Sequence, residues 1–291
     1  MNKPIKKAVL IAGGYSTRML PFTRWIPKEL LPLNGMPVIQ TLIDECADAG
    51  IEEIFVITRP DNTLLEDYYQ ENKKYRSYLI EHKKDTYIEK YEVNHPSGVR
   101  VEYIQEDENL PYGDALGLLM VREQMQYEDK FLVLFADDII FDSTSSVKKL
   151  IAYAELSDSV VTLSVAEKNL DEMMSFGNVY LKDEKTRQLS HIIRKPKLEE
   201  INTNLVMCGQ SVLSNIIYEY YDTFDYNVHP ELDTAVTVSR LATDHLVDTI
   251  KISGNWVTVG DPQNYLKANI ASHVFFGDIS KENLIQYINK L

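Results

Sequence analysis

The stretch Lys7-Ala8-Val9-Leu10-Ile11-Ala12-Gly13-Gly14 is a short apolar run that ends in two glycines. A continuous apolar run of this length is typical of a strand buried on both faces of a parallel sheet. Residues 38–47 then carry apolar pairs at helical spacing, and Gly50 ends this predicted helix. A second apolar run follows at 54–57. Strand, helix and strand in this order predict a βαβ unit.

The rest of the chain continues the alternation of strands and helices. Apolar or alternating runs predict further strands at 99–104, 131–135, 160–165, 177–181, 191–194 and 204–209. Helical spacing predicts helices at 113–126, 211–222, 231–244 and 262–275, with one or two surface helices in the charged, tyrosine-rich segment 62–92. The fold class is therefore α/β, a Rossmann-like doubly wound mixed sheet with helices on both faces.

The C-terminal segment 276–291 predicts an amphipathic helix. Its apolar side chains fall on one helical face: Leu284, Ile285, Ile288 and Leu291. This face is expected to pack on the body of the protein or on a second subunit.

Composition limits the classes of function. The 291 residues are 44% hydrophobic and 25% charged, as in an ordinary globular protein. The formal net charge is −14, which argues against binding to a nucleic-acid backbone. No apolar stretch approaches the length that spans a bilayer, and the N-terminus lacks a signal sequence. Cys46 and Cys208 lie in apolar segments and are expected in the core. The sequence therefore predicts a cytoplasmic protein that binds neither a membrane nor a nucleic acid.

A loop rich in glycine and basic residues follows the first strand. After this strand the chain emerges at the carboxyl edge of the sheet, where open α/β folds bind ligands. Gly13 and Gly14 let backbone N–H groups approach phosphate oxygens closely. Arg18, Arg24 and Lys28 concentrate positive charge in an otherwise acidic chain. Neither G-x-G-x-x-G nor G-K-[ST] occurs in the loop, so it is not a dinucleotide fingerprint or a Walker A loop. The missing fingerprint also opposes an NAD-dependent oxidoreductase.

Residues 12–33 read A-G-G-Y-S-T-R-M-L-P-F-T-R-W-I-P-K-E-L-L-P-L. This pattern resembles the signature loop of the sugar-nucleotide pyrophosphorylases, and within them it is most similar to bacterial UTP–glucose-1-phosphate uridylyltransferases. The resemblance extends over 7–275. It implies a single nucleotidyltransferase domain at 1–275, with a nucleotide-binding half at about 1–165 and a sugar-binding half at about 166–275.

The resemblance implies an enzyme that joins an NTP, expected to be UTP, to a sugar 1-phosphate, expected to be glucose 1-phosphate, with release of pyrophosphate. It implies Mg²⁺ as cofactor, held by Asp137 at the end of the strand 131–135, and a homo-oligomer, either a dimer or a tetramer. The implied catalytic cations are Arg18, Lys28 and Lys195. The implied nucleotide contacts are Ala12, Gly13, Gly14, Ser16, Thr17, Glu106, Gly113 and Asp114. The implied sugar contacts are Gly177, Arg194, Asn204 and Gly209.

Four positions depart from the family pattern. Ser16 replaces a glycine, which is a mild change. Glu106 falls where the family often has a glutamine that reads the base. A carboxylate can only accept hydrogen bonds, which favours a base with an N–H donor. Alternatively, the neighbouring Gln105 fills this role. Arg194 replaces a glutamate that receives sugar hydroxyls, which suggests an acidic or phosphorylated substrate. Thr258 replaces a second metal-binding aspartate.

These departures leave two alternatives open. One is a related nucleotidyltransferase for another base or sugar phosphate, with CTP or dTTP as donor. The other is a catalytically weak paralogue that binds sugar nucleotides as a regulatory subunit. The six histidines are scattered and suggest neither a metal site nor a catalytic triad.

Overall fold

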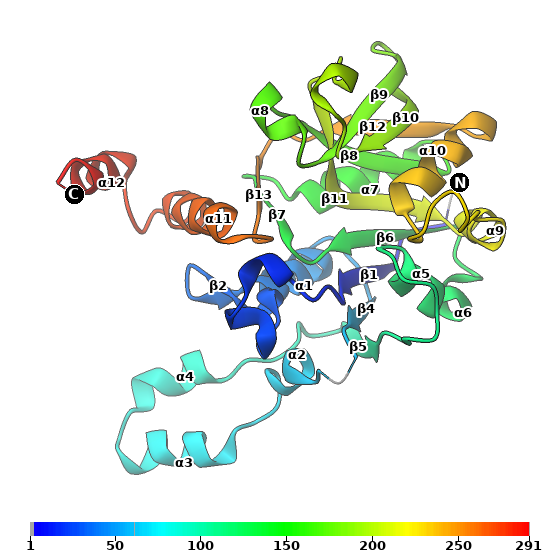
Figure 1. The fold of residues 1–291 in the computed structure, drawn as a ribbon. Coiled ribbons are helices and arrows are strands. Elements are labelled where there is room, and N and C mark those ends of the chain that lie inside the picture. Colours follow the sequence, from blue (N-terminus) through cyan, green and yellow to red (C-terminus); the bar gives the residue numbers. More distant parts are fainter. Residues whose placement is uncertain (1–2, 61, 291) are drawn as a thin grey trace.

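The computed structural model describes residues 3–60 and 62–290. Within these residues, nine strands form one mixed sheet in the order β5-β4-β1-β6-β11-β8-β12-β10-β9 (Figure 1). In that order the strands are Arg100–Gln105, Glu53–Thr58, Lys7–Ala12, Lys130–Phe135, Leu205–Ser214, Val161–Glu167, Val247–Lys251, Gln188–Arg194 and Gly177–Asp183. The predicted doubly wound mixed sheet is confirmed, and it runs through both halves of the chain.

The first part of the sheet is parallel. β1 pairs in parallel with β4 and β6, and β4 pairs in parallel with β5. The carboxyl ends of these four strands therefore lie at one edge of the sheet. Residues that directly follow them, such as Gly13, Arg59, Glu106 and Asp137, are brought to this edge from four separate parts of the chain.

Helices cover both faces of the sheet (Figure 1). α1 (Val38–Asp48) and α7 (Ser146–Leu156) share one buried apolar cluster with β1, β4 and β6. The opposite cluster contains side chains of α5 (Leu116–Met120), α6 (Arg122–Met125), α9 (Ile217–Asp222) and α10 (Thr234–Asp244). Cys46 and Cys208 are buried and free, as expected.

Three local predictions differ from the structure. Residues 211–214 belong to β11 and not to a helix, because this strand pairs on both sides, with β6 and β8. The predicted helix at 113–126 is two short helices that are separated at Val121. The strands β12 and β13 (Asn255–Thr258) were not predicted.

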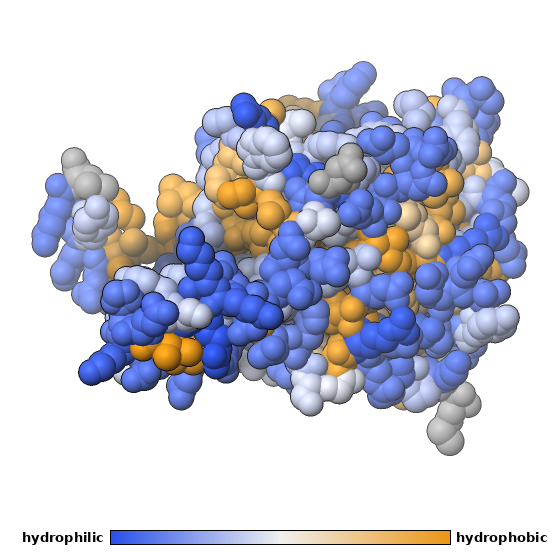
Figure 2. All heavy atoms as spheres, turned by 90° about the horizontal axis from the view of Figure 1, so that it is seen from below, coloured by the Kyte–Doolittle hydropathy of each residue, from blue (hydrophilic) through white to orange (hydrophobic). Residues whose placement is uncertain are grey.

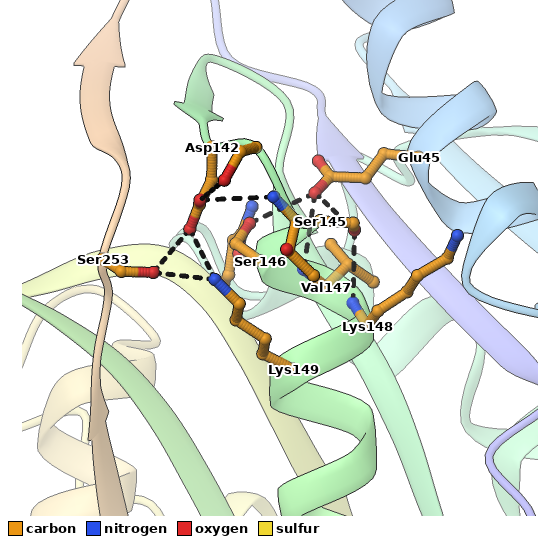
Figure 3. A network of polar contacts seen from close by, with 11 residues as sticks. Glu45, Asp142, Ser145, Ser146, Val147, Lys148, Lys149 and Ser253 are labelled. Atoms are coloured by element: carbon orange, nitrogen blue, oxygen red, sulfur yellow. Dashed lines mark hydrogen bonds and ion pairs between the residues drawn. The ribbon is translucent and has the colours of Figure 1, made fainter.

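A polar network joins elements on the α1 face (Figure 3). The Glu45 carboxylate of α1 accepts hydrogen bonds from the hydroxyls of Ser145 and Ser146, at 2.9 and 3.1 Å, at the start of α7. Asp142, at the end of β7 (Asp138–Phe141), accepts from Lys149 Nζ at 2.8 Å and from Ser253 Oγ at 2.6 Å. The network thus fixes α7 against α1 and against the chain that enters β13.

β7 and β13 form a separate antiparallel ribbon, in which Thr258 is opposite Asp138. A short hairpin of β2 (Pro32–Leu33) and β3 (Met36–Pro37) precedes α1. The remaining single turns of 3₁₀ helix are Thr17–Met19, Phe22–Arg24, Lys28–Leu30, Asp85–Tyr87 and Leu198–Glu200, and α8 covers Leu170–Met173. The ribbon brings residues near 258 to the chain that follows β6.

The segment 64–91 forms a helical arm below the sheet, with α2 (Leu64–Asp67), α3 (Lys73–Glu81) and α4 (Ile88–Tyr91) (Figure 1). Seen from below, the surface of the molecule is mainly hydrophilic, with scattered apolar patches (Figure 2). The prediction of surface helices here agrees with the structure.

The C-terminal helix α11 (Pro262–Phe275) packs on β13 and β2 and buries Ala268, whereas α12 (Lys281–Ile288) stands away from the body in both views (Figures 1 and 2). Ile285 and Ile288 are 58% and 51% exposed, so the expected packing of this face on the body is not observed. Leu291, which was predicted on the same face, lies outside the described residues. Among the described residues, no helix has both the length and the apolar character needed to cross a bilayer.

Candidate active site

The loop after β1 is held in place by a buried arginine. Arg59 follows β4, and its guanidinium donates to the backbone carbonyls of Thr23 and Trp25, each at 3.0 Å. The Thr23 hydroxyl in turn donates to the Ser16 carbonyl at 2.8 Å. Arg59 was not a predicted site residue, although its position directly after the second strand of the βαβ unit indicates that it reaches the same edge as the loop.

Lys28 and Asp137 form an ion pair at the centre of the site. Lys28 Nζ donates to Asp137 Oδ2 at 2.8 Å, and only 14% of the lysine side chain is exposed. Burial lowers the pKa of Lys28, but the carboxylates of Asp137 and Glu29 outweigh it and hold the pKa above its ordinary value. Burial raises the pKa of Asp137, and the Lys28 ammonium outweighs that effect and lowers it. Both groups are therefore charged at neutral pH.

Arg18 lies beside this pair. Its guanidinium is 3.6 Å from Asp261 Oδ2, and the side chain is 69% exposed, so it can turn towards a ligand. Gly260 makes this approach possible: a Cβ there would lie 2.8 Å from Arg18 Nη2 and 3.4 Å from Asp137 Oδ2. Gly260 and Asp261 were not predicted site residues. They reach Arg18 because the β7–β13 ribbon returns the chain to the end of β6.

Two cavities of about 230 Å³ each meet at this point. They share the lining residues Asp114, Phe135, Asp137 and Arg194. The first cavity extends along the loop after β1 and is also lined by Gly13, Gly14, Tyr15, Lys28, Glu106, Tyr112 and Gly113. The second extends over the other half of the chain and is also lined by Arg18, Phe176, Gly177, Lys195, Gly209, Trp256, Thr258 and Asp261. A two-part ligand that spans both would cross the ion pair.

Glycines shape the first cavity. A Cβ on Gly13 would collide with the Glu106 carboxylate, so the missing side chain lets Glu106 lie over this backbone. Gly113 has φ +150°, and a Cβ there would collide with the backbone of Leu232. Leu232 and Gly113 thus bring the start of α10 against the loop that precedes α5, which closes the cavity on that side.

Arg194 does not present a free positive charge. Its guanidinium forms ion pairs with Asp114, at 3.0 Å, and with Asp233 at the start of α10. Burial lowers the pKa of Arg194, and these two carboxylates outweigh it and raise it. Because this charge is compensated within the protein, Arg194 gives no support for an acidic or phosphorylated sugar substrate.

Carboxylates gather at the end of β6. Asp138 Oδ2 accepts from the Gly209 N–H at 2.9 Å, and the Asp138 side chain also hydrogen-bonds to Thr258. Burial, together with the charge of Asp137, raises the pKa of Asp138 to about 7. Protein donors therefore occupy Asp138, and the Asp137 carboxylate accepts from Lys28 Nζ and from its own backbone N–H. Asp137 lines both cavities, and its carboxylate is the oxygen ligand that a hard divalent cation takes.

Not every predicted residue reaches a cavity. Asn204 is exposed, and its carbonyl accepts from the Lys168 N–H beyond the second cavity. Ala12 ends β1, Ser16 and Thr17 belong to the loop after it, and all three are absent from the lining of both cavities. Ser16 has φ 53°, and its hydroxyl donates to the Gly14 carbonyl at 3.2 Å. Ser16 thus shapes the loop, and the contacts predicted for these four residues stay predictions.

The mixed sheet and the paired cavities at its edge fit a transferase for nucleotide substrates. The chain belongs to the nucleotidyl transferase family, whose model matches residues 7–273. It is 27% identical over 290 residues to a UTP–glucose-1-phosphate uridylyltransferase of Staphylococcus haemolyticus, with 99% of each chain covered. It is 28% identical to UTP–glucose-1-phosphate uridylyltransferase 2 of Staphylococcus saprophyticus, again over 99% of each chain.

Solved structures have the same fold. A UDP-glucose pyrophosphorylase from Acinetobacter baumannii superposes with a TM-score of 0.83 at 23% identity, over 98% of this chain and 99% of that one. The UTP-bound enzyme from Acinetobacter baumannii gives a TM-score of 0.81 at 24% identity, with 99% of each chain covered. A UDP-glucose pyrophosphorylase in complex with UDP-glucose gives 0.77 at 23% identity, over 92% of this chain and 98% of that one.

Proposed function

We propose that this chain transfers the uridylyl group of UTP to glucose 1-phosphate and releases pyrophosphate. The observation that carries the proposal is the junction of two cavities at the Lys28–Asp137 ion pair, with Arg18 beside it. The names of the staphylococcal relatives support the choice of UTP and glucose 1-phosphate.

The chemistry needs no protein nucleophile. The sugar phosphate is already an anion, and it attacks the α-phosphorus of the nucleotide while pyrophosphate leaves. Catalysis then depends on position and on the stabilisation of negative charge. In this arrangement Lys28 faces the first cavity from the loop after β1, where it would hold the triphosphate. Lys195 and Arg18 line the second cavity, where they would hold the sugar phosphate and the charge that develops in transfer.

The proposal includes Mg²⁺, held by Asp137. A bound magnesium ion would neutralise phosphate charge. Thr258 supplies no carboxylate, so Asp137 is the metal-binding carboxylate in the proposal, and Asp138 keeps its bonds to Gly209 and Thr258. In the free protein Lys28 occupies Asp137 Oδ2, which keeps the carboxylate charged until the ligands arrive.

A coupled pyrophosphate assay tests the proposed reaction. The purified protein is incubated with glucose 1-phosphate and each of UTP, dTTP, CTP, ATP and GTP, with and without Mg²⁺. Pyrophosphate release that depends on both UTP and Mg²⁺ is the expected result. Turnover with CTP or dTTP alone would reassign the base, and tight binding of UDP-glucose without any turnover would assign a regulatory protein.

The proposal also includes a homo-oligomer. The exposed apolar side chains in 275–288 support it, among them Phe275, Phe276, Ile285 and Ile288. Light scattering coupled to gel filtration distinguishes a monomer from a dimer or tetramer. The use of a nucleoside triphosphate supports the predicted cytoplasmic location.

A further inference from the structure

The first cavity contains a carboxylate that the proposed reaction does not use. Glu106 follows β5, is half-buried and lines this cavity, whereas Gln105 is exposed and absent from its lining. Within the described part of the chain, no residue forms a hydrogen bond or an ion pair with the Glu106 carboxylate. The structure therefore selects Glu106, and not Gln105, as the side chain that a nucleotide in this cavity would meet.

Glu106 lies against the glycine turn in the first cavity. Its carboxylate lies over the backbone of Gly13, where any side chain would collide with it. Lys28 lies beside the same glycine turn, since a Cβ on Gly14 would be 3.8 Å from its Nζ. A nucleotide whose phosphates bind at Lys28 would thus extend along Gly14 and Gly13 and bring the edge of its base to Glu106.

The hydrogen-bonding groups of uracil do not match an ionised carboxylate. Its edge offers the N3–H donor next to the O4 acceptor. An ionised carboxylate can only accept, so one oxygen would take N3–H and the other would face the lone pairs of O4. A neutral carboxylic acid has one acceptor and one donor and can satisfy both groups. Guanine, with adjacent N1–H and N2–H donors, is the base that suits the ionised form.

The charges around Glu106 do not oppose its protonation. The two cations that line the cavity are already paired, Lys28 with Asp137 and Arg194 with Asp114 and Asp233. The other titratable groups in the lining are the carboxylate of Glu231 and the phenols of Tyr15 and Tyr112. Arg59, which lies over the Tyr15 ring, donates to Thr23 and Trp25. Burial raises the pKa of Glu106 above its ordinary value, and a bound base would bury it further.

We propose that Glu106 reads the uracil of UTP as a neutral carboxylic acid, so that UTP binding is coupled to the uptake of one proton. The proton comes from solvent and bonds to the carboxylate; its O–H then donates to O4, while the other oxygen accepts from N3–H. This inference rests on the proposed function. It predicts that UTP affinity falls about tenfold per pH unit above the pKa of Glu106 in the free protein.

Calorimetric titration with UTP and Mg²⁺ tests the inference. Titrations in buffers of different ionisation enthalpy give the number of protons taken up, at about pH 6.5, 7.5 and 8.5. Wild type is expected to take up close to one proton more than Glu106→Gln at the two higher values. The variant is expected to bind UTP more tightly there, with a Kd that changes far less with pH. Glu108→Gln, an exposed position outside the cavity lining, is the matched control and should behave as wild type.

The outcomes separate the two proposals. UTP binding with equal proton uptake in wild type and Glu106→Gln would overturn the role of Glu106 and leave the proposed function standing. No UTP binding by either protein would overturn the proposed function itself. Tight binding of GTP by wild type, lost in Glu106→Gln, would show an ionised Glu106 that reads guanine and would overturn both.

Discussion

Arg18 and Arg24 are both exposed cations of the loop after β1, but their surroundings differ. Arg18 lines the second cavity, close to Asp137 and Asp261. Arg24 lies over the Trp25 ring and is absent from the lining of both cavities. Charge alone therefore does not make a catalytic residue, and position relative to the ion pair distinguishes these two arginines.

We expect Arg18→Ala to retain the fold and to lose about a hundredfold or more in kcat. A contact made to the charge of the transition state contributes on the order of 3 kcal/mol. The measurement is pyrophosphate release at saturating substrates, with circular dichroism to check folding. Arg24→Ala is the control and should keep its turnover. A normal kcat in Arg18→Ala would refute the assigned role.

The sequence predicted the cations of the loop after β1 from one contiguous pattern, and the family resemblance supplied more distant lining residues such as Asp137 and Lys195. Gly13, Arg18 and Lys28 share one loop, so short-range spacing was enough to associate them. The positive charge of Arg194 is compensated by Asp114 and Asp233, which are 80 and 39 residues away in the sequence. Arg59, Gly260 and Asp261 also reach the site only through strand pairing. A single sequence does not encode such distances, so their roles became visible only in the folded chain.

At the scale of elements, continuous apolar runs predicted the buried strands β1, β4 and β6, and helical spacing predicted α1, α10 and α11. The end of β11 was predicted as a helix, although this strand also lies inside the sheet, between β6 and β8. Residues 206 and 208–213 of β11 are buried on both faces, and the polar Gln210 and Ser211 interrupt the apolar run. A strand of this kind lacks alternation, and its end was mistaken for the start of a helix.

The network around α7 makes an element-level prediction about acid stability. Burial alone would raise the pKa of Asp142, but hydrogen bonds from Lys149 and Ser253 outweigh it and lower the pKa from 3.8 to about 2. A carboxylate whose pKa is lower in the folded than in the unfolded state stabilises the fold at any pH above its unfolded-state pKa. This stabilisation is lost as the pH falls from 3.8 towards 2.

Asp142→Asn should therefore lower the free energy of unfolding by about 2 kcal/mol at neutral pH. The difference from wild type should shrink as the pH falls through this acid range. Urea unfolding followed by circular dichroism at a series of pH values measures both effects. The exposed Asp171→Asn should match wild type throughout. A constant difference between Asp142→Asn and wild type at every pH would contradict the assigned ion pair.

At the scale of the whole molecule, the C-terminal helix is separate from the core. No residue of α12 is buried, and it stands away from the body in both views (Figures 1 and 2). The sequence predicted its amphipathic face but not whether the body covers it, because amphipathicity alone does not identify the partner surface.

Removal of the residues after Ile279 should leave the thermal unfolding midpoint of the monomer within about 2 °C of the full chain, because almost no buried apolar surface is lost. Light scattering should show a smaller assembly if α12 contributes to the proposed oligomer. Calorimetry and light scattering on the same samples distinguish the two effects. A large loss of thermal stability without any change in mass would show that α12 packs on its own body.

The ion pair between Lys28 and Asp137 has a consequence for how charged ligands enter. In the free protein each of these two partly covered charges already has a counterion at 2.8 Å. An incoming cation can bind Asp137 while an incoming polyanion binds Lys28. Each charge then exchanges one counterion for another, and neither is left buried without a counterion. The free protein thus holds both charges in a partly buried place where either charge alone would be destabilising.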